Sequence, residues 1–361
     1  MQSTPLRYLR ADFDDLEEYA PVKPLDVLAA EIGVPIDRLV KLDANENLYG
    51  PLPEIRAAIE QADLHIYPDP GQAALREAIA GYAGVAPEQV VAGTGADELI
   101  DIVLRLTMPD AVVNVTPTFG MYQFLAQVNR SRVIEVPRDG GFAPDLEGIA
   151  RAVEDGARVV FLTSPNNPTG NALTPEQVDA LCQLDALIVV DEAYIEFGGR
   201  TATGKLAKYG NLVILRTFSK WAALAGLRVG YALCHPDLAL RMMAIKQPYN
   251  VNIAADVAAR AAIEHRGQIQ EMVRSIVAER DRMARLLAQT GWLRPLPSEA
   301  NFVLFEVLGR SALDVRDGLR RQGVLVRYYN RPDLHNYIRI SAGRPEDTDR
   351  LVAALHHLEP A

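Results

Sequence analysis

The chain has 361 residues, of which 49% are hydrophobic, and its formal net charge at pH 7 is −10. A chain of this length forms about two domains, and its apolar content is high enough for a sizeable core, which argues against a disordered protein. The acidic charge argues against a nucleic-acid-binding protein, because phosphates require a basic face.

The first forty residues are rich in proline and charge, and they predict an arm that joins a smaller domain elsewhere in the chain. Its first 21 residues, MQSTPLRYLRADFDDLEEYAP, contain acidic residues and no apolar run, so a signal peptide is not expected. No apolar stretch of the sequence reaches the roughly 20 residues that span a membrane. We therefore expect a cytoplasmic protein.

Short apolar runs and helical patterns alternate through the middle of the chain. Most of these runs are continuously apolar, which is typical of strands buried on both faces of a largely parallel sheet. The predicted strands are 89–92, 111–115, 132–136, 159–163, 187–190, 212–215 and 229–233. Helices are predicted between several of them, and the helix 175–182 has a strong start signal in Thr174 as N-cap, Pro175 and Gln177.

Beyond about residue 250 the pattern changes. A charge-rich helical region covers about 254–290, and the β-like segments NFVLFEV, VLVRYY and YIRIS follow, with a helix between the first two. This order of elements predicts a smaller α+β domain. The expected fold class is α/β, with a large domain at 41–280 around a mostly parallel sheet and a small C-terminal domain at 281–361, which the arm 1–40 joins.

The two cysteines, Cys182 and Cys234, are far apart in apolar settings, and small buried residues are expected at both positions. The six histidines show no spacing typical of metal ligands. We expect neither a disulfide framework nor a metal site.

Polar or glycine-rich clusters follow four of the predicted strands. They are GTGADE from Gly93, SPNNPTG from Ser164, DEAY from Asp191 and RTFSK from Arg216. In an open α/β sheet, ligands bind at the carboxyl ends of the strands. Each cluster alone has an ordinary explanation, such as a strand-to-helix turn, an Asp–Arg pair or a solvated lysine, but the four together indicate a binding site.

The first cluster suits a phosphate group. Gly93 and Gly95 allow a tight turn, and the helix that continues from Asp97 points its free N–H groups at an anion. No stretch matches the P-loop of nucleoside triphosphatases, so that alternative is not supported.

The later clusters add an acid and an amine. Asp191 ends a hydrophobic run, and a carboxylate there requires a cationic partner such as a protonated ring nitrogen. Lys220 follows the strand 212–215, where its amine can react with an aldehyde. With the phenol of Tyr194, the amide of Asn167 and the phosphate cradle, these residues form the set of groups that pyridoxal 5'-phosphate requires.

On these residues the sequence resembles the fold-type I pyridoxal-phosphate-dependent aminotransferases, and among them the histidinol-phosphate aminotransferase branch. The matching stretches occur in family order over most of the chain. They are LDANENLYGP (42–51), YPD (67–69), GADE (95–98), PTFGMY (117–122), SPNNPTG (164–170), DEAYIEF (191–197), TFSKWAALAGLR (217–228) and YIRIS (337–341). The resemblance implies the fold of that class, with a mostly parallel central sheet in the large domain.

The resemblance assigns catalytic roles to Lys220, Asp191 and Tyr194. It implies that Lys220 holds the cofactor as a Schiff base and that Asp191 keeps the pyridine nitrogen protonated. Tyr194 and Asn167 would hydrogen-bond the 3'-oxygen. Phe119, where the family usually has tyrosine, would stack on the ring without offering a hydroxyl, and Trp221 replaces a smaller residue.

The remaining cofactor contacts implied by the resemblance are to the phosphate. They come from the backbone of Ala96 and Asp97, from Ser219 and Arg228, and from Tyr67 of a neighbouring subunit. The last of these implies a homodimer.

The resemblance assigns substrate contacts to Tyr19, Asn45, Arg327 and Arg339. The sequence supports Arg339 independently, because Tyr337, Arg339 and Ser341 share one face of the YIRIS strand. A guanidinium binds carboxylate or phosphate in a bidentate manner, although a solvated strand arginine would give the same pattern.

The expected function is transamination between L-histidinol phosphate and 2-oxoglutarate in histidine biosynthesis, which yields imidazole acetol phosphate and L-glutamate. Two alternatives use the same cofactor, namely an aromatic amino acid aminotransferase and a lyase such as threonine-phosphate decarboxylase. A transcription regulator with this cofactor would need a separate DNA-binding domain, for which the short acidic arm leaves no room.

Overall fold

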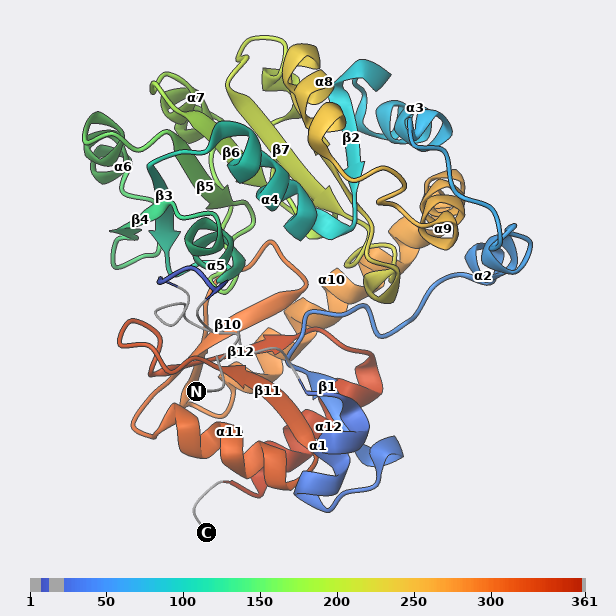
Figure 1. Cartoon of the computed structure of the whole chain (residues 1–361). Coiled ribbons are helices and arrows are strands. Elements are labelled where there is room, and N and C mark those ends of the chain that lie inside the picture. The colour runs from blue at the N-terminus through green and yellow to red at the C-terminus, as the bar shows by residue number, and fades with distance from the viewer. Residues whose placement is uncertain (1–7, 13–22, 359–361) are drawn as a thin grey trace, which may run out of the picture.

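The computed structural model describes residues 8–12 and 23–358, which form two regions that are each built on their own sheet (Figure 1). Tyr19, one of the predicted substrate contacts, lies outside the described residues.

The larger region contains a seven-stranded sheet. Its strands are β2 (Val90–Gly93), β3 (Ala111–Thr116), β4 (Arg132–Pro137), β5 (Val159–Thr163), β6 (Leu187–Asp191), β7 (Leu212–Thr217) and β8 (Gly230–Leu233). They lie in the order β2-β8-β7-β6-β5-β3-β4, and only the pairings of β8 are antiparallel. The predicted α/β class with a mostly parallel sheet is therefore confirmed, and all seven predicted strands are present.

Helices cover both faces of this sheet. One face is buried by α4 (Gly95–Thr107), α5 (Met121–Val128) and α8 (Pro236–Ile245), and the other by α2 (Pro53–Glu60), α3 (Ala73–Ala83), α6 (Leu146–Glu154), α7 (Pro175–Cys182) and α9 (Ile253–Glu264). Because both faces are covered, central strands such as β5 are buried throughout. Helix α7 begins with the predicted capping box, in which Thr174 Oγ1 accepts from the Gln177 N–H and the Gln177 side chain accepts from the Thr174 N–H.

The smaller region has a mixed sheet in the order β1-β11-β12-β10-β9. Its strands are β1 (Val40–Leu42), β9 (Leu293–Pro295), β10 (Phe302–Val307), β11 (Val324–Tyr328) and β12 (Tyr337–Ser341), and its core also includes side chains of α11 (Ala312–Arg321) and α12 (Pro345–His356). Strand β1, which follows α1 (Leu25–Ile32), pairs with β11 in parallel. The N-terminal part of the chain thus joins a sheet built mainly from its C-terminal part.

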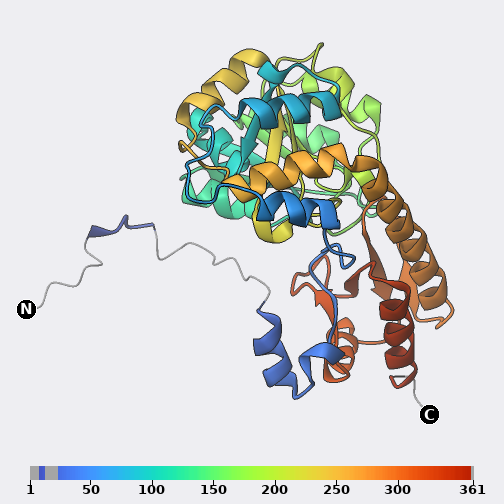
Figure 2. The same ribbon diagram turned by 90° about the vertical axis from the view of Figure 1, so that its right-hand side faces the viewer.

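The helix α10 (Arg266–Ala288) connects the two regions (Figure 2). Ile276 belongs to the core of the larger region and Met283 to the core of the smaller one. The predicted helical region beyond residue 250 is thus two helices, which are separated at His265, because α9 packs on the larger region whereas α10 leaves it to reach the second core. We propose that the border between the two domains falls within α10, near residue 280.

Candidate active site

A cavity of about 550 Å³ lies at the carboxyl ends of the strands of the large sheet, and residues of β11 and β12 complete its wall. Most of the predicted site residues meet there. Those that line the cavity are Asn45, Ala96, Asp97, Phe119, Asn167, Asp191, Tyr194, Ser219, Lys220, Arg228, Arg327 and Arg339.

Lys220 enters the cavity from the turn that follows β7. Its Nζ donates a hydrogen bond of 3.4 Å to the Ala44 carbonyl oxygen and lies 6.0 Å from the centre of the Tyr194 ring. Burial, followed by the positive charge of Arg339, lowers the pKa of the amine from 10.5 to about 8. The uncharged form, which is nucleophilic and can accept a proton, is therefore accessible near neutral pH.

Asp191 is the last residue of β6, and its carboxylate is buried at the cavity wall. Its Oδ2 accepts a hydrogen bond of 2.7 Å from the Tyr122 hydroxyl, and Oδ1 accepts one of 3.0 Å from the Ala193 N–H. Burial raises the pKa of Asp191 to about 6 against the opposing effect of these two donors. The arginine close by, Arg216, pairs with Glu192 instead, so Asp191 can pair with a cationic group in the cavity.

Tyr122 is a site residue to which sequence reasoning assigned no role. It lies on α5 and is fully buried, and its hydroxyl contacts Thr163 Oγ1 at 2.8 Å as well as Asp191. The only signal in the sequence is that a buried phenol hydroxyl requires a polar partner. Because this hydroxyl donates to Asp191, it favours the ionised carboxylate.

The N-terminus of α4 forms a cradle for an anion. The side chain of the N-cap residue Thr94 does not cap this helix end, and Ala96 and Asp97 of its first turn line the cavity. Arg228 Nη2 lies 3.1 Å from Asp97 Oδ2, and Nη1 lies 3.5 Å from Ser219 Oγ. Gly95 has a φ of +76°, which favours glycine, and a Cβ there would lie 2.7 Å from Arg228 Nη2 and would displace this guanidinium from the cradle. Backbone N–H groups, a hydroxyl and a guanidinium together fit a phosphate monoester.

Asn45 connects the two sheets at the cavity. It is buried, its φ is +54°, and its Nδ2 donates a hydrogen bond of 3.0 Å to the Tyr194 hydroxyl. Its Oδ1 accepts one of 2.8 Å from Ser341 Oγ on β12. Burial raises the pKa of Tyr194 to about 12, so this phenol stays neutral and can donate its own proton to a ligand. Direct contact between Asn45 and a substrate stays a prediction.

Arg339 is held firmly in the wall opposite Asp191 and Lys220. Only 5% of it is exposed, and Nη1 donates a hydrogen bond of 2.6 Å to Asn167 Oδ1 while Nη2 donates to the Asp43 carbonyl oxygen. The alternative of a solvated strand arginine is therefore wrong.

Arg327 lies directly opposite Arg339 in the antiparallel pairing of β11 and β12, and both residues line the cavity. Like charges opposite each other on a sheet are unfavourable. This wall therefore favours an anionic group from a ligand between or beside the two guanidinium groups.

Three further predicted residues differ in where they lie. Phe119 lines the cavity and meets the Tyr122 ring edge-on, with 5.6 Å between ring centres. Trp221 is buried outside the cavity lining and stacks on Tyr82. Tyr67 is 80% exposed and stacks on Tyr249, so it does not line the cavity of its own chain.

Both cysteines are free and buried, as expected, and burial raises the pKa of Cys182 to about 11 and of Cys234 to about 12. Within residues 8–12 and 23–358, no three His, Cys, Asp or Glu side chains are grouped so that they could hold a metal ion. No helix in that part of the chain is long and apolar enough to cross a membrane.

Comparison with known proteins agrees with this geometry. The family model described as aminotransferase class I and II matches residues 37–355. The histidinol-phosphate aminotransferase of Roseiflexus castenholzii is 45% identical over 359 residues, which cover 96% of this chain and 97% of the relative. That of Dehalococcoides mccartyi is 45% identical over 352 residues and 97% of both chains. The crystal structure of the Sinorhizobium meliloti histidinol-phosphate aminotransferase in complex with pyridoxal-5'-phosphate matches with a TM-score of 0.87 and 30% identity, over 98% of this chain and 100% of that chain.

Proposed function

The chain belongs to the aminotransferase class I and II family, and from that premise we propose that it transfers the amino group of L-histidinol phosphate to 2-oxoglutarate with pyridoxal 5'-phosphate as cofactor. One observation carries this proposal: a single cavity contains Lys220, Asp191 and the N-terminus of α4 on one wall and two arginines on the other. The first wall suits the cofactor, and the second suits the acidic groups of both substrates. The products are imidazole acetol phosphate and L-glutamate, which places the reaction in histidine biosynthesis.

The residues of the first wall fit the cofactor. When bound, it supplies an aldehyde that takes up amino groups and a pyridine ring that withdraws electrons from the substrate. Asp191 would hold a proton on the ring nitrogen, and the N-terminus of α4 with Ser219 and Arg228 would bind the phosphate. Because Asn167 Oδ1 already accepts from Arg339, its Nδ2 is left to donate to the 3'-oxygen beside the Tyr194 hydroxyl.

Lys220 would both bind the cofactor and move a proton. When it is not bonded to the cofactor, its uncharged Nζ would take the proton from the substrate carbon that bears the amino group. The lowered pKa of about 8 suits this role, because the amine loses its own proton without a strongly basic partner.

Arg339 and Arg327 would bind the acidic groups of the two substrates in turn. L-histidinol phosphate carries a phosphate and no carboxylate, whereas glutamate carries two carboxylates, and a planar guanidinium can form paired hydrogen bonds with either group. The predicted contact by Tyr19 is part of the same proposal.

A homodimer in the cytoplasm is also part of the proposal. The exposed ring of Tyr67 lies outside the lining of its own cavity and is available to a second copy of the chain. In a dimer it would add a hydroxyl to the phosphate cradle of the partner.

The proposal is tested by measuring amino transfer to 2-oxoglutarate from L-histidinol phosphate, phenylalanine and threonine phosphate side by side. We expect L-histidinol phosphate to give the highest kcat/KM. A preference for phenylalanine would assign the chain to the aromatic aminotransferases, and carbon dioxide release from threonine phosphate would assign it to the lyases.

A further inference from the structure

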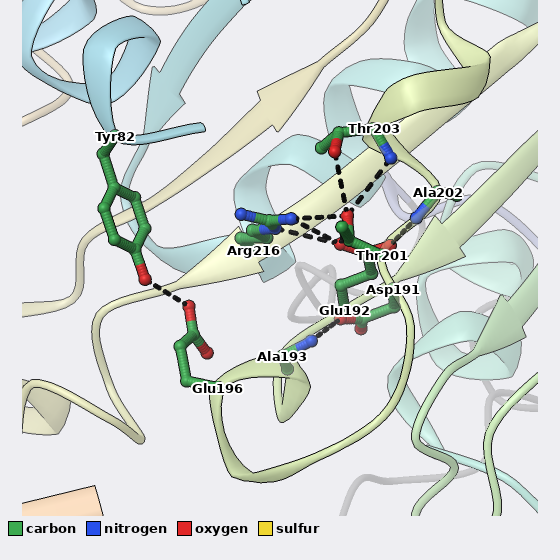
Figure 3. A network of polar contacts seen from close by, with 9 residues as sticks. All are labelled: Tyr82, Asp191, Glu192, Ala193, Glu196, Thr201, Ala202, Thr203 and Arg216. Carbon is green, nitrogen blue, oxygen red and sulfur yellow. Dashed lines mark hydrogen bonds and ion pairs between the residues drawn. The ribbon is translucent and has the colours of Figure 1, made fainter. Parts of the chain in front are cut away.

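A buried ion pair lies directly behind the two residues assigned to the cofactor chemistry. Asp191 and Thr217 line the cavity, and each has a charged neighbour in the chain, Glu192 and Arg216, that does not. Because successive residues of a strand point to opposite faces, the side chains of these two neighbours lie on the side away from the cavity. Arg216 Nε and Nη2 lie 2.9 and 2.8 Å from Glu192 Oε2, and both side chains are almost fully buried (Figure 3). The pair joins the end of β6, which presents Asp191, to the end of β7, which leads to Lys220.

The Glu192 carboxylate also holds the loop that follows. Its Oε1 accepts a hydrogen bond of 2.6 Å from the Ala202 N–H, and its Oε2 accepts one of 2.9 Å from the Thr201 hydroxyl. Arg216 Nη2 donates to the same hydroxyl at 2.6 Å. Because of these hydrogen bonds, the buried charges of Glu192 and Arg216 are well compensated. The ends of β6 and β7 therefore form a rigid support for the residues that follow them.

A second acid extends these contacts towards Lys220. Glu196 lies in the short helix η4 (Ile195–Phe197), and its Oε1 accepts a hydrogen bond of 3.2 Å from the Tyr82 hydroxyl. The Tyr82 ring stacks on Trp221, with 5.3 Å between ring centres and 10° between ring planes. Trp221 directly follows Lys220 in the chain. The charge of Arg216 also acts on Glu196. Partly buried contacts therefore continue from Trp221, the neighbour of Lys220, to the ion pair that includes Glu192, the neighbour of Asp191.

We propose that Tyr82 and Glu196 are positioning residues, which act through Trp221 to fix the orientation of Lys220 relative to Asp191. This inference rests on the proposed role of Lys220. Neither Tyr82, Glu196 nor Trp221 lines the cavity, so their effect passes through packing and hydrogen bonds rather than through contact with a ligand.

The turn that carries Lys220 needs such support. Between β7 and the 3₁₀ helix at 225–227 the chain has neither helix nor strand, and Ala223 has a left-handed φ of +59°, which is unfavourable for a residue with a side chain. Three contacts hold Trp221 in this turn: Asn47 Nδ2 donates to its carbonyl oxygen at 3.1 Å, the Tyr82 ring stacks on its indole, and the Phe218 ring packs against it at a tilt. Misplacement of a catalytic group by about 1 Å can cost on the order of a hundredfold in rate.

Glu196 also makes this support sensitive to pH. Burial raises the pKa of Glu196 to about 7, against the effects of Arg216 from β7 and Tyr82 from α3, while Glu192 after β6 raises it further. Tyr231 from β8 also faces this acid electrostatically. An ionised carboxylate accepts a stronger hydrogen bond than a neutral one, so the bond from Tyr82 should weaken as Glu196 takes up its proton.

The test compares Tyr82→Phe, which keeps the ring and removes the hydroxyl, with Tyr209→Phe as a matched control. Tyr209 is buried, whereas Tyr82 is partly buried, and the Tyr209 hydroxyl also donates to a carboxylate, Asp179 Oδ1, at 2.9 Å. Tyr209 does not line the cavity. The measurements are kcat and KM with L-histidinol phosphate, and the pH midpoint at which the visible absorption band of the bound cofactor changes. We expect Tyr82→Phe to lower kcat about three- to tenfold, to leave KM within about twofold, and to shift the midpoint by about 0.3 pH units or more. Tyr209→Phe should leave kcat and the midpoint unchanged.

A second pair of variants tests the hydrogen bond itself. Glu196→Ala should reproduce Tyr82→Phe, whereas Glu196→Gln keeps an oxygen for the Tyr82 hydroxyl and should restore kcat to within about twofold of the parent. The inference is overturned if Tyr82→Phe matches Tyr209→Phe in both kcat and midpoint, or if Glu196→Gln is as impaired as Glu196→Ala. Failure of the proposed function is distinguishable, because the parent enzyme would then not turn over L-histidinol phosphate, whereas the absorption midpoints are compared without any substrate.

Discussion

The two walls of the cavity are built in different ways. On the cofactor wall, burial moves the pKa of Lys220 down to about 8 and that of Asp191 up to about 6, so both groups can change protonation near neutral pH. On the substrate wall, Arg327 and Arg339 lie opposite each other on the small sheet, and Arg339 is fixed by hydrogen bonds to Asn167 and Asp43. The first wall offers groups that exchange protons, and the second offers a fixed positive charge. Substitutions on the first wall should therefore impair the chemistry, and those on the second should impair the recognition of substrates.

The largest effect is expected at Lys220. Lys220→Ala removes both the amine that binds the cofactor and the group that moves the proton, which should lower kcat by about 10³-fold or more. In the parent, borohydride reduction followed by peptide mass spectrometry should find the cofactor on Lys220. Attachment to Lys205, Lys208 or Lys246 instead would show that the amine of the cofactor wall has been misassigned.

The next largest effect is expected at Asp191. Asp191→Ala should keep the fold but lower kcat by about 10²-fold or more, because an unprotonated ring nitrogen withdraws electrons poorly. Asp191→Glu, which keeps a carboxylate, should recover part of the loss, and circular dichroism checks that both variants are folded. If the kcat of Asp191→Ala stays within about threefold of the parent, the activation barrier has risen by well under about 1.4 kcal/mol. Asp191 would then have no role in the chemical steps.

The same two walls differ in how far the sequence predicts them. The groups of the cofactor wall follow strands in short local motifs, so the strand pattern alone placed Lys220 and Asp191 at one edge of a sheet. The hydrogen bonds that surround these groups could not be predicted from local patterns. Asn45, for example, forms hydrogen bonds with Tyr194 and Ser341, which are 149 and 296 residues away in the chain. Tyr122 meets Asp191 across 69 residues. Local patterns carry no information about which distant side chains meet when two sheets pack together.

Arg339→Ala should have an intermediate effect and act on both half-reactions. A hydrogen bond to a charged group is worth roughly 1.5–3 kcal/mol, so kcat/KM should fall about ten- to a hundredfold for each substrate. Arg339→Lys should recover little, because an ammonium group cannot form the paired bonds. Single-turnover kinetics of each half-reaction measure this effect. If Arg339→Ala slows neither half-reaction, the substrate role passes to Arg327 or to another residue.

Arg339→Ala also tests whether the two walls are independent. The positive charge of Arg339 contributes to the lowered pKa of Lys220 after burial itself, so its removal should raise that pKa. The measurement is the pH dependence of chemical modification of Lys220 in the cofactor-free protein. An unchanged midpoint would mean that the substrate wall has no electrostatic influence on the amine.

The smallest effect is expected for Tyr122→Phe, which changes the protonation of the cofactor wall without removing either of its reactive groups. The Tyr122 hydroxyl donates to Asp191 and stabilises its ionised form. Without that donor the pKa of Asp191 should rise above 6 by about one unit. In the cofactor-free protein the pKa of Asp191 is raised from its ordinary value of 3.8 to about 6, so folding favours the protonated carboxyl group. The contribution of Asp191 to the free energy of unfolding is therefore fully present below pH 3.8 and is lost as the pH rises through about 6. In the variant this loss should extend to higher pH.

Cofactor binding should respond to Tyr122→Phe in the opposite sense, because the ionised form of Asp191 is the one that pairs with a protonated ring nitrogen. Affinity for the cofactor should therefore fall as the pH drops through the pKa of Asp191, and in Tyr122→Phe this fall should begin about one pH unit higher. Binding titrations from about pH 5 to about pH 8 should show a loss of about three- to tenfold at the acidic end and little change at the alkaline end. Tyr209→Phe serves as the control for loss of a buried hydroxyl. If the Tyr122→Phe curve overlays that of the parent at every pH, the hydroxyl holds Asp191 in place without setting its charge, and Asp191 owes its ionisation to the bound ring nitrogen alone.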